Sequence, residues 1–426
     1  MAGVSSSSAV ARPSGALWTR LSIAPFPVTL ALAALTCALA PAYTVRWQIG
    51  FYPTTVLEDA VALTVAAFAV ESWRARAVPD LRSPFTIAAA VFLVAGAIDV
   101  VVAPDLRAAL GIYRAYLIEP VAFFFVLASV VRTARQALLV LAGLGLGGAV
   151  VGVANWVVIF DALLHHTLNP AVTAPVVVYD NANDVALFLV PLIAVAGSVT
   201  LYSSNTRERL WSAAFLVVAV TSTLLSFSRG GYLALAVVAG GLAVSHRRRW
   251  WLVSGATGVG IVLLMVPPIN HRVGVELDFS NPSNTLVGRF ELWRVSLTML
   301  LQHPLFGAGL SGFAQTLAPY WNPTHADRFI YPHNILLTFW SETGLLGLAA
   351  FAWIMLTGFV QTWRGRRAGS AWRPIELGVF LAMVAVLVHG LVDVPYFKND
   401  LSLEFWVLLG IAWAGRRWAR ESHAVA

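Results

Sequence analysis

A histidine, an asparagine and two arginines are the residues of this chain whose types and positions best suit chemistry on a phosphorylated substrate. His333 and Asn334 stand at the start of a hydrophobic segment, directly after a long polar stretch. A histidine side chain titrates near neutral pH, so His333 could take a proton from a hydroxyl as a general base. Arg229 could hold a diphosphate oxygen and Arg289 could reach a lipid phosphate, because guanidinium groups bind phosphate through paired hydrogen bonds.

Each of these residues also has an ordinary structural interpretation. A histidine at the mouth of a membrane helix can be a polar anchor or a helix cap, and Arg229 can belong to a tight turn. Pro332 fixes the chain before His333, and Asn334 adds a second donor and acceptor beside it. An arginine near hydrocarbon costs about 2.5–3.5 kcal/mol at mid-helix and is usually retained for a partner. The two glycines that follow Arg229 would open the backbone to such a partner.

A carboxylate and two glycines follow the histidine in the same segment. Glu342 lies nine residues after His333, which at 100° per residue is half a turn away from the histidine. Glu342 is therefore expected to contact another helix and not to orient His333. Gly344 and Gly347 are expected to let two helices pack closely.

The remaining polar candidates are predicted to support the site. Arg114 and Glu119 are expected to form an intramembrane pair beside a cavity, and Arg328 in the long loop is a further supporting candidate. Residues 307–312 match G-x-G-x-x-G but lack the preceding strand of a dinucleotide site. The acidic stretch 180–184 lacks the Cys or His spacing of a zinc site. The sequence therefore predicts neither a cofactor nor a metal.

The composition is that of a polytopic membrane protein. Of 426 residues 58% are hydrophobic and 12% are charged, and the mean hydropathy is +0.75. The formal charge of +7 is scattered in short clusters, which excludes a nucleic-acid-binding stripe. Cys37 is the single cysteine, so no disulfide can form within the chain.

Twelve apolar segments long enough to cross a bilayer recur along the chain, which predicts an all-α fold. They are 24–42, 54–72, 84–103, 110–131, 137–160, 184–203, 210–227, 230–245, 249–267, 333–362, 375–393 and 400–415. The predicted regions are a tail at 1–23, nine helices in 24–267, an extracytoplasmic loop at 268–332, three helices in 333–415 and a tail at 416–426.

The basic residues predict the orientation of these segments. The tail and every second loop carry nineteen of the 28 Lys and Arg residues, which by the positive-inside rule puts both termini in the cytoplasm. The alternation persists through all twelve segments and puts 268–332 and His333 outside the cytoplasm. The first segment is expected to be retained, although residues 38–40 resemble a signal-peptidase site.

The long outer loop contains one predicted amphipathic helix, from Thr285 to Gln302. Its apolar stripe comprises Phe290, Trp293, Leu297, Leu300 and Leu301. Arg289 and Arg294 flank the stripe, which suits a helix lying in the membrane interface with its arginines on lipid phosphates.

Four motifs in order resemble the O-antigen ligase and O-antigen polymerase family. They are Ser228-Arg229-Gly230-Gly231, Arg289 followed by Trp293, His303-Pro304-Leu305-Phe306-Gly307-Ala308-Gly309, and His333-Asn334 with Gly344-Leu345-Leu346-Gly347. The twelve-helix layout and the long outer loop before the tenth helix match as well. The resemblance covers roughly residues 180–350 by motif and the whole chain by topology.

The resemblance implies a metal-independent glycosyltransferase of the bacterial inner membrane. Such enzymes move a glycan from undecaprenyl diphosphate to an acceptor, typically a lipid A core sugar, at the outer face of that membrane. Carried over to this chain, His333 would activate the acceptor hydroxyl, while Arg229 and Arg289 would hold the diphosphate.

Three alternatives remain open at this stage. The same machinery could polymerise repeat units, as an O-antigen polymerase does, or glycosylate a protein. A transporter or flippase of lipid-linked glycans is the alternative from another class, since twelve helices with internal arginines would suit an anionic lipid-linked solute. Transporters usually place polar groups near the midplane and show related halves, whereas here the candidates cluster at the outer face and no internal repeat is evident.

Overall fold

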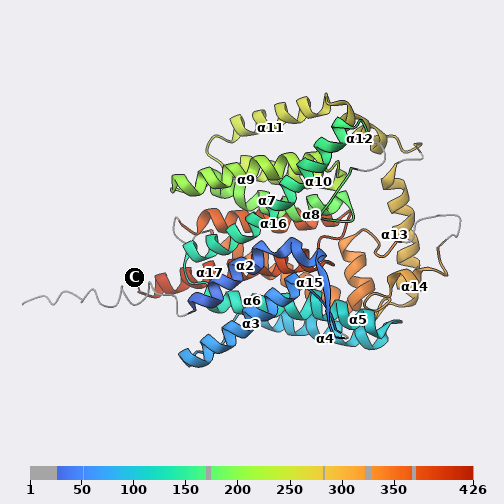
Figure 1. Cartoon of the computed structure of the whole chain (residues 1–426). Coiled ribbons are helices and arrows are strands. Elements are labelled where there is room, and N and C mark those ends of the chain that lie inside the picture. Colours follow the sequence, from blue (N-terminus) through green and yellow to red (C-terminus); the bar gives the residue numbers. More distant parts are fainter. Residues whose placement is uncertain are drawn as a thin grey trace, which may run out of the picture.

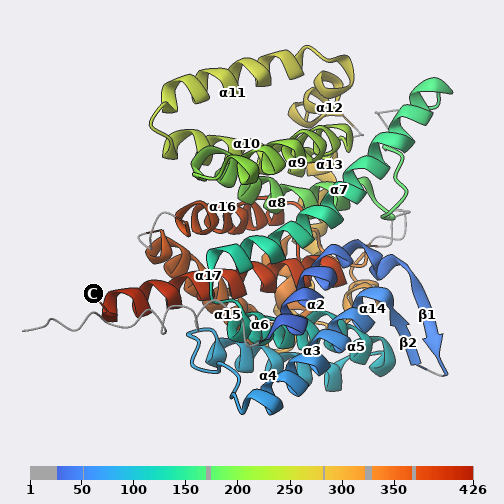
Figure 2. The same cartoon turned by 60° about the vertical axis from the view of Figure 1, so that its left-hand side comes forward.

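The computed structural model describes residues 26–50, 52–168, 174–281, 284–321, 329–366 and 371–425. Most of its long helices lie side by side along a common direction, α13 runs across one end of them, and one short hairpin projects from the bundle (Figures 1 and 2). The elements are α2 (Pro27–Ala38), η1 (Ala40–Thr44), β1 (Arg46–Ile49), β2 (Tyr52–Thr55), α3 (Val56–Ala75), α4 (Thr86–Val102), α5 (Leu106–Ile112), η2 (Tyr113–Ile118), α6 (Glu119–Val130), α7 (Ala134–Leu164), α8 (Ala182–Tyr202), α9 (Thr206–Leu225), α10 (Arg229–Ser245), α11 (Arg249–Leu264), α12 (Pro267–Leu277), α13 (Thr285–Gln302), α14 (Phe313–Leu317), α15 (Ile335–Gly365), α16 (Arg373–Gly390) and α17 (Asn399–Val425).

The all-α membrane fold predicted from the sequence is confirmed. Every one of the twelve predicted segments coincides with a helix or a continuous helical stretch. Within the described ranges, six helical stretches are long and apolar enough to cross a bilayer, and three shorter apolar helices accompany them. The count of twelve spans remains a prediction, because a helix can be present without crossing the membrane.

Polar caps set where many of the helices begin. Thr55 and Thr133 each form a capping box with the residue three positions later, at the starts of α3 and α7. The side chains of Asn181, Asn284 and Asn334 accept hydrogen bonds from the first backbone N–H groups of α8, α13 and α15. These caps explain why helix starts could be located from the sequence to within a few residues.

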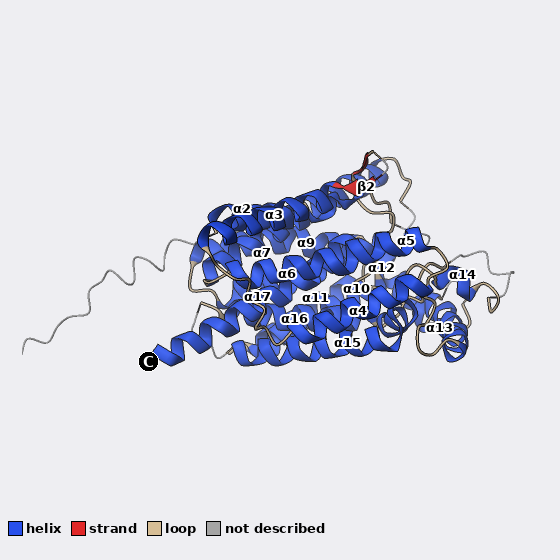
Figure 3. Cartoon of the chain, turned by 90° about the horizontal axis from the view of Figure 1, so that it is seen from below, coloured by secondary structure: helices blue, strands red, loops and turns tan. Residues whose placement is uncertain are grey.

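The two ends of the bundle differ in content. One end carries α5, α13, α14 and the hairpin, and the C-terminus of α17 lies at the other (Figures 1 and 3). At the C-terminal end, Arg417 pairs with Asp80 at 2.9 Å and donates to the carbonyls of Ala128 and Val131. The segments around Asp80 and Val131, at two of the loops predicted to face the cytoplasm, therefore meet α17 at this end.

Helix α15 is kinked, whereas the sequence predicts one uninterrupted helix over 333–362. Thr343 has φ −129° and Gly344 has φ +60° with ψ −175°, so the helix changes direction there. The backbone N–H of Leu345 donates to the carbonyl of Leu305 at 3.0 Å, and a Cβ on Gly344 would lie 2.3 Å from that oxygen. Glycine is needed at 344 for this loop contact, so the expectation that it packs two helices together is wrong.

The stretch from Leu106 to Val130 is also irregular. Its middle, η2, is a π-helix that lies before Pro120. Proline has no backbone N–H and cannot bond to the carbonyl four residues earlier, which belongs to Tyr116. The hydroxyl of Tyr396 donates to that carbonyl at 2.9 Å. A residue from the α16–α17 connection therefore satisfies the backbone group that the proline leaves free.

The predicted amphipathic helix is α13, with the bounds expected from the sequence. Its protein-facing side includes Leu292 and Met299, both fully buried, while Phe290, Leu297 and Leu301 of the predicted stripe are exposed. Leu300 of the predicted stripe is fully buried and the Trp293 indole bonds to the Pro332 carbonyl, so only part of the stripe is left exposed for a membrane interface. Arg294 and Glu291, however, form an exposed ion pair at 2.8 Å.

Candidate active site

His333 lies against a carboxylate that sequence reasoning did not single out. Its Nδ1 is 3.0 Å from Oδ1 of Asp393, in the connection between α16 and α17. A carboxylate only accepts, so Nδ1 carries the proton in this contact and Nε2 keeps its lone pair. The His333 side chain is 28% exposed and that of Asp393 is 9% exposed, so the base is reachable while its partner is covered. The pair has the geometry of a general base held by an orienting carboxylate.

Arg289 completes this cluster from α13. Its Nη2 lies 3.8 Å from Oδ2 of Asp393, the oxygen that His333 does not use. Burial by itself would raise the pKa of the Asp393 carboxyl. The hydrogen bond from His333 and the positive charges around the carboxyl outweigh burial and hold the pKa well below its usual range. Asp393 therefore stays ionised at any physiological pH.

The backbone around His333 is held from two sides. His333 has φ +50°, a left-handed conformation that is uncommon outside glycine and often marks a functional position. The indole of Trp293 donates to the carbonyl of Pro332 at 2.9 Å. Asn334 caps α15 with its oxygen and donates through Nδ2 to the carbonyl of Leu391 at 3.1 Å. Asn334, and not His333, is thus the helix cap.

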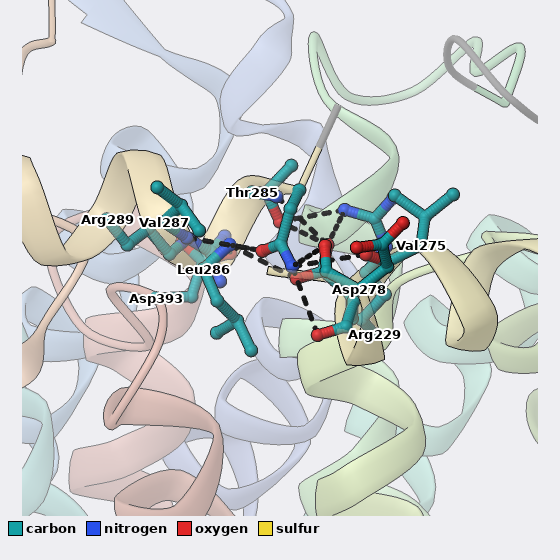
Figure 4. Close-up of polar contacts among 10 residues, drawn as sticks. Arg229, Val275, Asp278, Thr285, Leu286, Val287, Arg289 and Asp393 are labelled. Atoms are coloured by element: carbon teal, nitrogen blue, oxygen red, sulfur yellow. Dashed lines mark hydrogen bonds and ion pairs between the residues drawn. The ribbon is translucent and has the colours of Figure 1, made fainter. Parts of the chain in front are cut away.

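Arg229 stands at the first position of α10, on the other side of the N-terminal turn of α13 from Arg289 (Figure 4). It donates to Oγ1 of Thr285 at 2.7 Å and pairs closely with the carboxylate of Glu276, from α12. The same carboxylate accepts from the backbone N–H groups of Thr285 and Leu286, both at 3.1 Å. An arginine and a helix N-terminus therefore bind an anionic group here.

The glycines after Arg229 have a different role from the one expected. Gly230 and Gly231 are buried, and a Cβ at these positions would lie 2.8 Å from the ring of His389 and 2.6 Å from Ala186. They let α10 approach α16 and α8 closely and do not open the backbone to a ligand. The close approach brings Arg229 towards the connection that carries Asp393.

The supporting candidates divide into three cases. Arg114 pairs with Glu119 at 3.4 Å, as expected, and also with Glu58 at 2.6 Å. Glu342 is fully buried and accepts from the backbone N–H of Ser311 at 2.6 Å and from that of Phe313, so it holds the glycine-rich loop 307–312 and the first residue of α14. Arg328 lies outside the described residues.

The structure thus brings His333 and Arg289 together on the Asp393 carboxylate. Arg229 contacts Thr285, which lies one helix turn before Arg289 on α13. Sequence reasoning missed Asp393 and Glu276. Asp393 was recognisable only as an acid in the outer turn that also holds Lys398, and Glu276 as an acid shortly before the amphipathic helix. In the described ranges no group of three His, Cys, Asp or Glu side chains is placed to hold a metal ion.

Comparison with known proteins supports the motif analysis. Residues 214–352 match a family model described as O-antigen ligase. This segment runs from within α9 to within α15 and contains Arg229, Arg289 and His333, but not Asp393. The match confirms, for this segment, the resemblance to the O-antigen ligase and polymerase family.

A curated protein from Haemophilus influenzae, described as uncharacterized, is also similar. It is 25% identical over 175 residues, which cover 35% of this chain and 43% of that protein. The chain therefore spans less than half of the length of this relative.

Proposed function

We propose, from the chain's place in the O-antigen ligase and polymerase family, that it is a ligase-type glycosyltransferase. It moves a glycan from undecaprenyl diphosphate to an acceptor hydroxyl, that of a lipid A core sugar, at the outer face of the inner membrane. Both termini lie in the cytoplasm and the site faces the periplasm. The observation that carries the proposal is the contact of His333 and Arg289 with the two oxygens of Asp393.

The reaction is a displacement at the anomeric carbon of the transferred sugar. Nε2 of His333 accepts the proton of the acceptor hydroxyl as its oxygen attacks that carbon. The bond from the carbon to the diphosphate breaks, and the electron pair leaves with the diphosphate. Asp393 stabilises the imidazolium that forms, as an orienting carboxylate does in other His–Asp pairs.

The leaving group needs positive charge and no general acid. A lipid diphosphate leaves as a stable anion, so arginines already in place can stabilise the charge that builds on it. Arg289 is only loosely paired, at 3.8 Å from Asp393, and can contact a phosphate oxygen with little rearrangement. Arg229 lies at the N-terminal turn of α13, where it shares the Glu276 carboxylate with two backbone N–H groups, so a phosphate that displaced this carboxylate would meet all three donors.

Replacement of His333 tests this function directly. In cells that lack the native gene, His333→Ala is expected to restore no glycan transfer, whereas the wild-type chain restores it. Unchanged envelope glycan in cells carrying His333→Ala would show that His333 is not the base. The protein level in membranes must be equal for both chains.

The gene deletion itself identifies the acceptor. Loss of all glycan from the lipid A core indicates a ligase, which is the expected result. A core that carries a single repeat unit indicates a polymerase instead, and loss of glycan from proteins indicates protein glycosylation. Retention of the lipid-linked glycan on the cytoplasmic face of the membrane indicates a flippase.

A further inference from the structure

A cavity lies at the same end of the bundle as His333, beneath the β1–β2 hairpin. Its volume is about 480 Å³, within the range of sites that bind small molecules. The hairpin, the start of α3, the π-helix η2 and the first residue of α17 line it. Figure 2 shows the hairpin extending beyond the neighbouring helices. Neither the family match at residues 214–352 nor the proposed reaction uses this cavity.

The polar groups of the cavity are fixed in place by a shared network. Glu58, 7% exposed, accepts from Nη2 of Arg114 at 2.6 Å and from Nδ2 of Asn399 at 2.8 Å. Arg114 also lies 4.6 Å above the ring of Tyr52 and 3.4 Å from Glu119. The π-helix positions Arg114, and such irregular turns inside helices are frequent at functional sites. The cavity is therefore preorganised for hydrogen bonding.

The charges of the lining nearly cancel. Arg46 and Arg114 line the cavity with Glu58, and the carboxylates of Asp59 and Glu119 bond to lining residues. Such a lining does not select a diphosphate, which needs an excess of positive charge. It suits an uncharged ligand that carries many hydroxyl groups.

Aromatic rings supply the apolar part of the lining. Trp47 is 52% exposed, and its indole N–H donates to Oδ2 of Asp59 at 2.9 Å, which holds the ring against the cavity. Tyr43 and Tyr116 also line it. Fixed aromatic faces beside a few directed polar groups are the lining expected for sugar rings, which have apolar faces and polar edges.

One short connection joins this cavity to the candidate active site. The chain from Leu391 to Asn399 contacts His333 through Asp393, the carbonyl of Tyr116 through Tyr396, and Glu58 through Asn399. A glycan bound in the cavity would thus lie beside the residues that hold the catalytic histidine.

We propose that the cavity under the β1–β2 hairpin binds sugar rings of one of the two glycans that react at His333. The proposal rests on the proposed glycosyl transfer for the identity of its ligand. The ligand class is a neutral oligosaccharide, and it belongs either to the donor repeat unit or to the acceptor core.

Binding and turnover are measured separately on the full chain in lipid nanodiscs. The probes are two oligosaccharides released from the envelope of the producing bacterium, the repeat unit and the delipidated core. Trp47→Ala is expected to weaken the binding of one of them at least tenfold and to leave turnover at saturating glycan within threefold. Trp73→Ala is the matched control, because Trp73 is 80% exposed near the far end of α3 and should change nothing.

Arg46→Ala is a second variant in case Trp47→Ala does not fold, since Arg46 lines the cavity on an exposed strand. Its expected result is the same loss of binding for the same probe. Weakened binding of the repeat unit assigns the cavity to the donor, and weakened binding of the core assigns it to the acceptor.

The proposal is overturned if neither probe binds the wild-type chain, or if both variants bind as the wild type does. It is also overturned if Trp73→Ala weakens binding equally.

Binding is repeated with His333→Ala in place, which separates the two proposals. If His333→Ala leaves transfer intact while Trp47→Ala still weakens binding at least tenfold, the catalytic role fails and the cavity assignment stands.

Discussion

Replacing Asp393 with asparagine tests the central contact of the candidate site. The amide can still accept a hydrogen bond from Nδ1 of His333, so the ring keeps its orientation. The variant loses the negative charge that would stabilise the imidazolium formed as the proton is transferred. Asp393→Asn should therefore slow the chemical step and change substrate binding little.

The size of the effect follows from the geometry. With N and O atoms 3.0 Å apart, the two charges are separated by about 4 Å and interact by about 4 kcal/mol at an effective dielectric constant of 20. Arg289 draws on the same carboxylate, so we expect about half of this energy, about 2 kcal/mol, to be lost from the transition state. A loss of this size lowers kcat by about 30-fold.

The assay is single-turnover transfer by the full chain in nanodiscs. The donor is the lipid-linked glycan that accumulates in a strain without the native enzyme. Asp161→Asn is the control, because Asp161 forms an ion pair with His165 on the exposed surface at 3.3 Å and should have no effect. A rate for Asp393→Asn within threefold of the wild-type rate, at equal folded fraction, would refute the orienting role.

Three further outcomes are expected. Glu276→Gln removes a negative charge beside Arg229 and should lower the KM for the diphosphate donor by about fivefold, or about 1 kcal/mol. Steady-state kinetics measures this KM, and a raised value would contradict a diphosphate at Arg229. Gly344→Ala should destabilise the fold by about 2–4 kcal/mol, because φ is +60° and the new Cβ would meet a carbonyl, while Gly145→Ala in open space should be near neutral. Labelling of the buried Cys37 thiol during heating measures the unfolding midpoints of both glycine variants, and equal midpoints would exclude strain at the kink. The stability lost in Asp393→Asn should be constant from pH 8 to pH 5 and shrink below about pH 4. The native pKa of Asp393 is depressed, so its carboxylate stabilises the fold above the ordinary aspartate pKa and ceases to do so in acid. Chemical unfolding of the wild type and of Asp393→Asn at each pH checks this pH dependence. A stability difference that grows in acid would contradict it.

Local patterns allowed the helices to be predicted from the sequence. Runs of apolar residues bounded by caps such as Thr55, Thr133 and Asn334 depend on neighbours within one turn, so helix starts were found closely. The bounds of α13 were found for the same reason, because the apolar repeat and the polar start both lie within the helix.

The parts that could not be predicted depend on distant residues. Asp393 lies 60 positions after His333, and nothing in the local pattern around either residue indicates their contact. The kink at Gly344 exists because Leu305 approaches the backbone there, and nothing in the sequence of the helix indicates that approach. Periodicity describes a helix in isolation and cannot report what another segment does to it.

The connection from Leu391 to Asn399 organises the site more than the start of α15 does. The start of α15 supplies the histidine, but the connection supplies the carboxylate, the donor to the Tyr116 carbonyl and the amide that bonds Glu58. A shift of this backbone would move the base and the hairpin cavity together. If the cavity holds a reacting glycan, glycan binding would then act on the orientation of His333 through one rigid segment, because both ends of that segment are fixed by buried partners. The coupling follows from connectivity, and a double-mutant cycle between Trp47 and Asp393 would measure it as non-additive losses in kcat/KM.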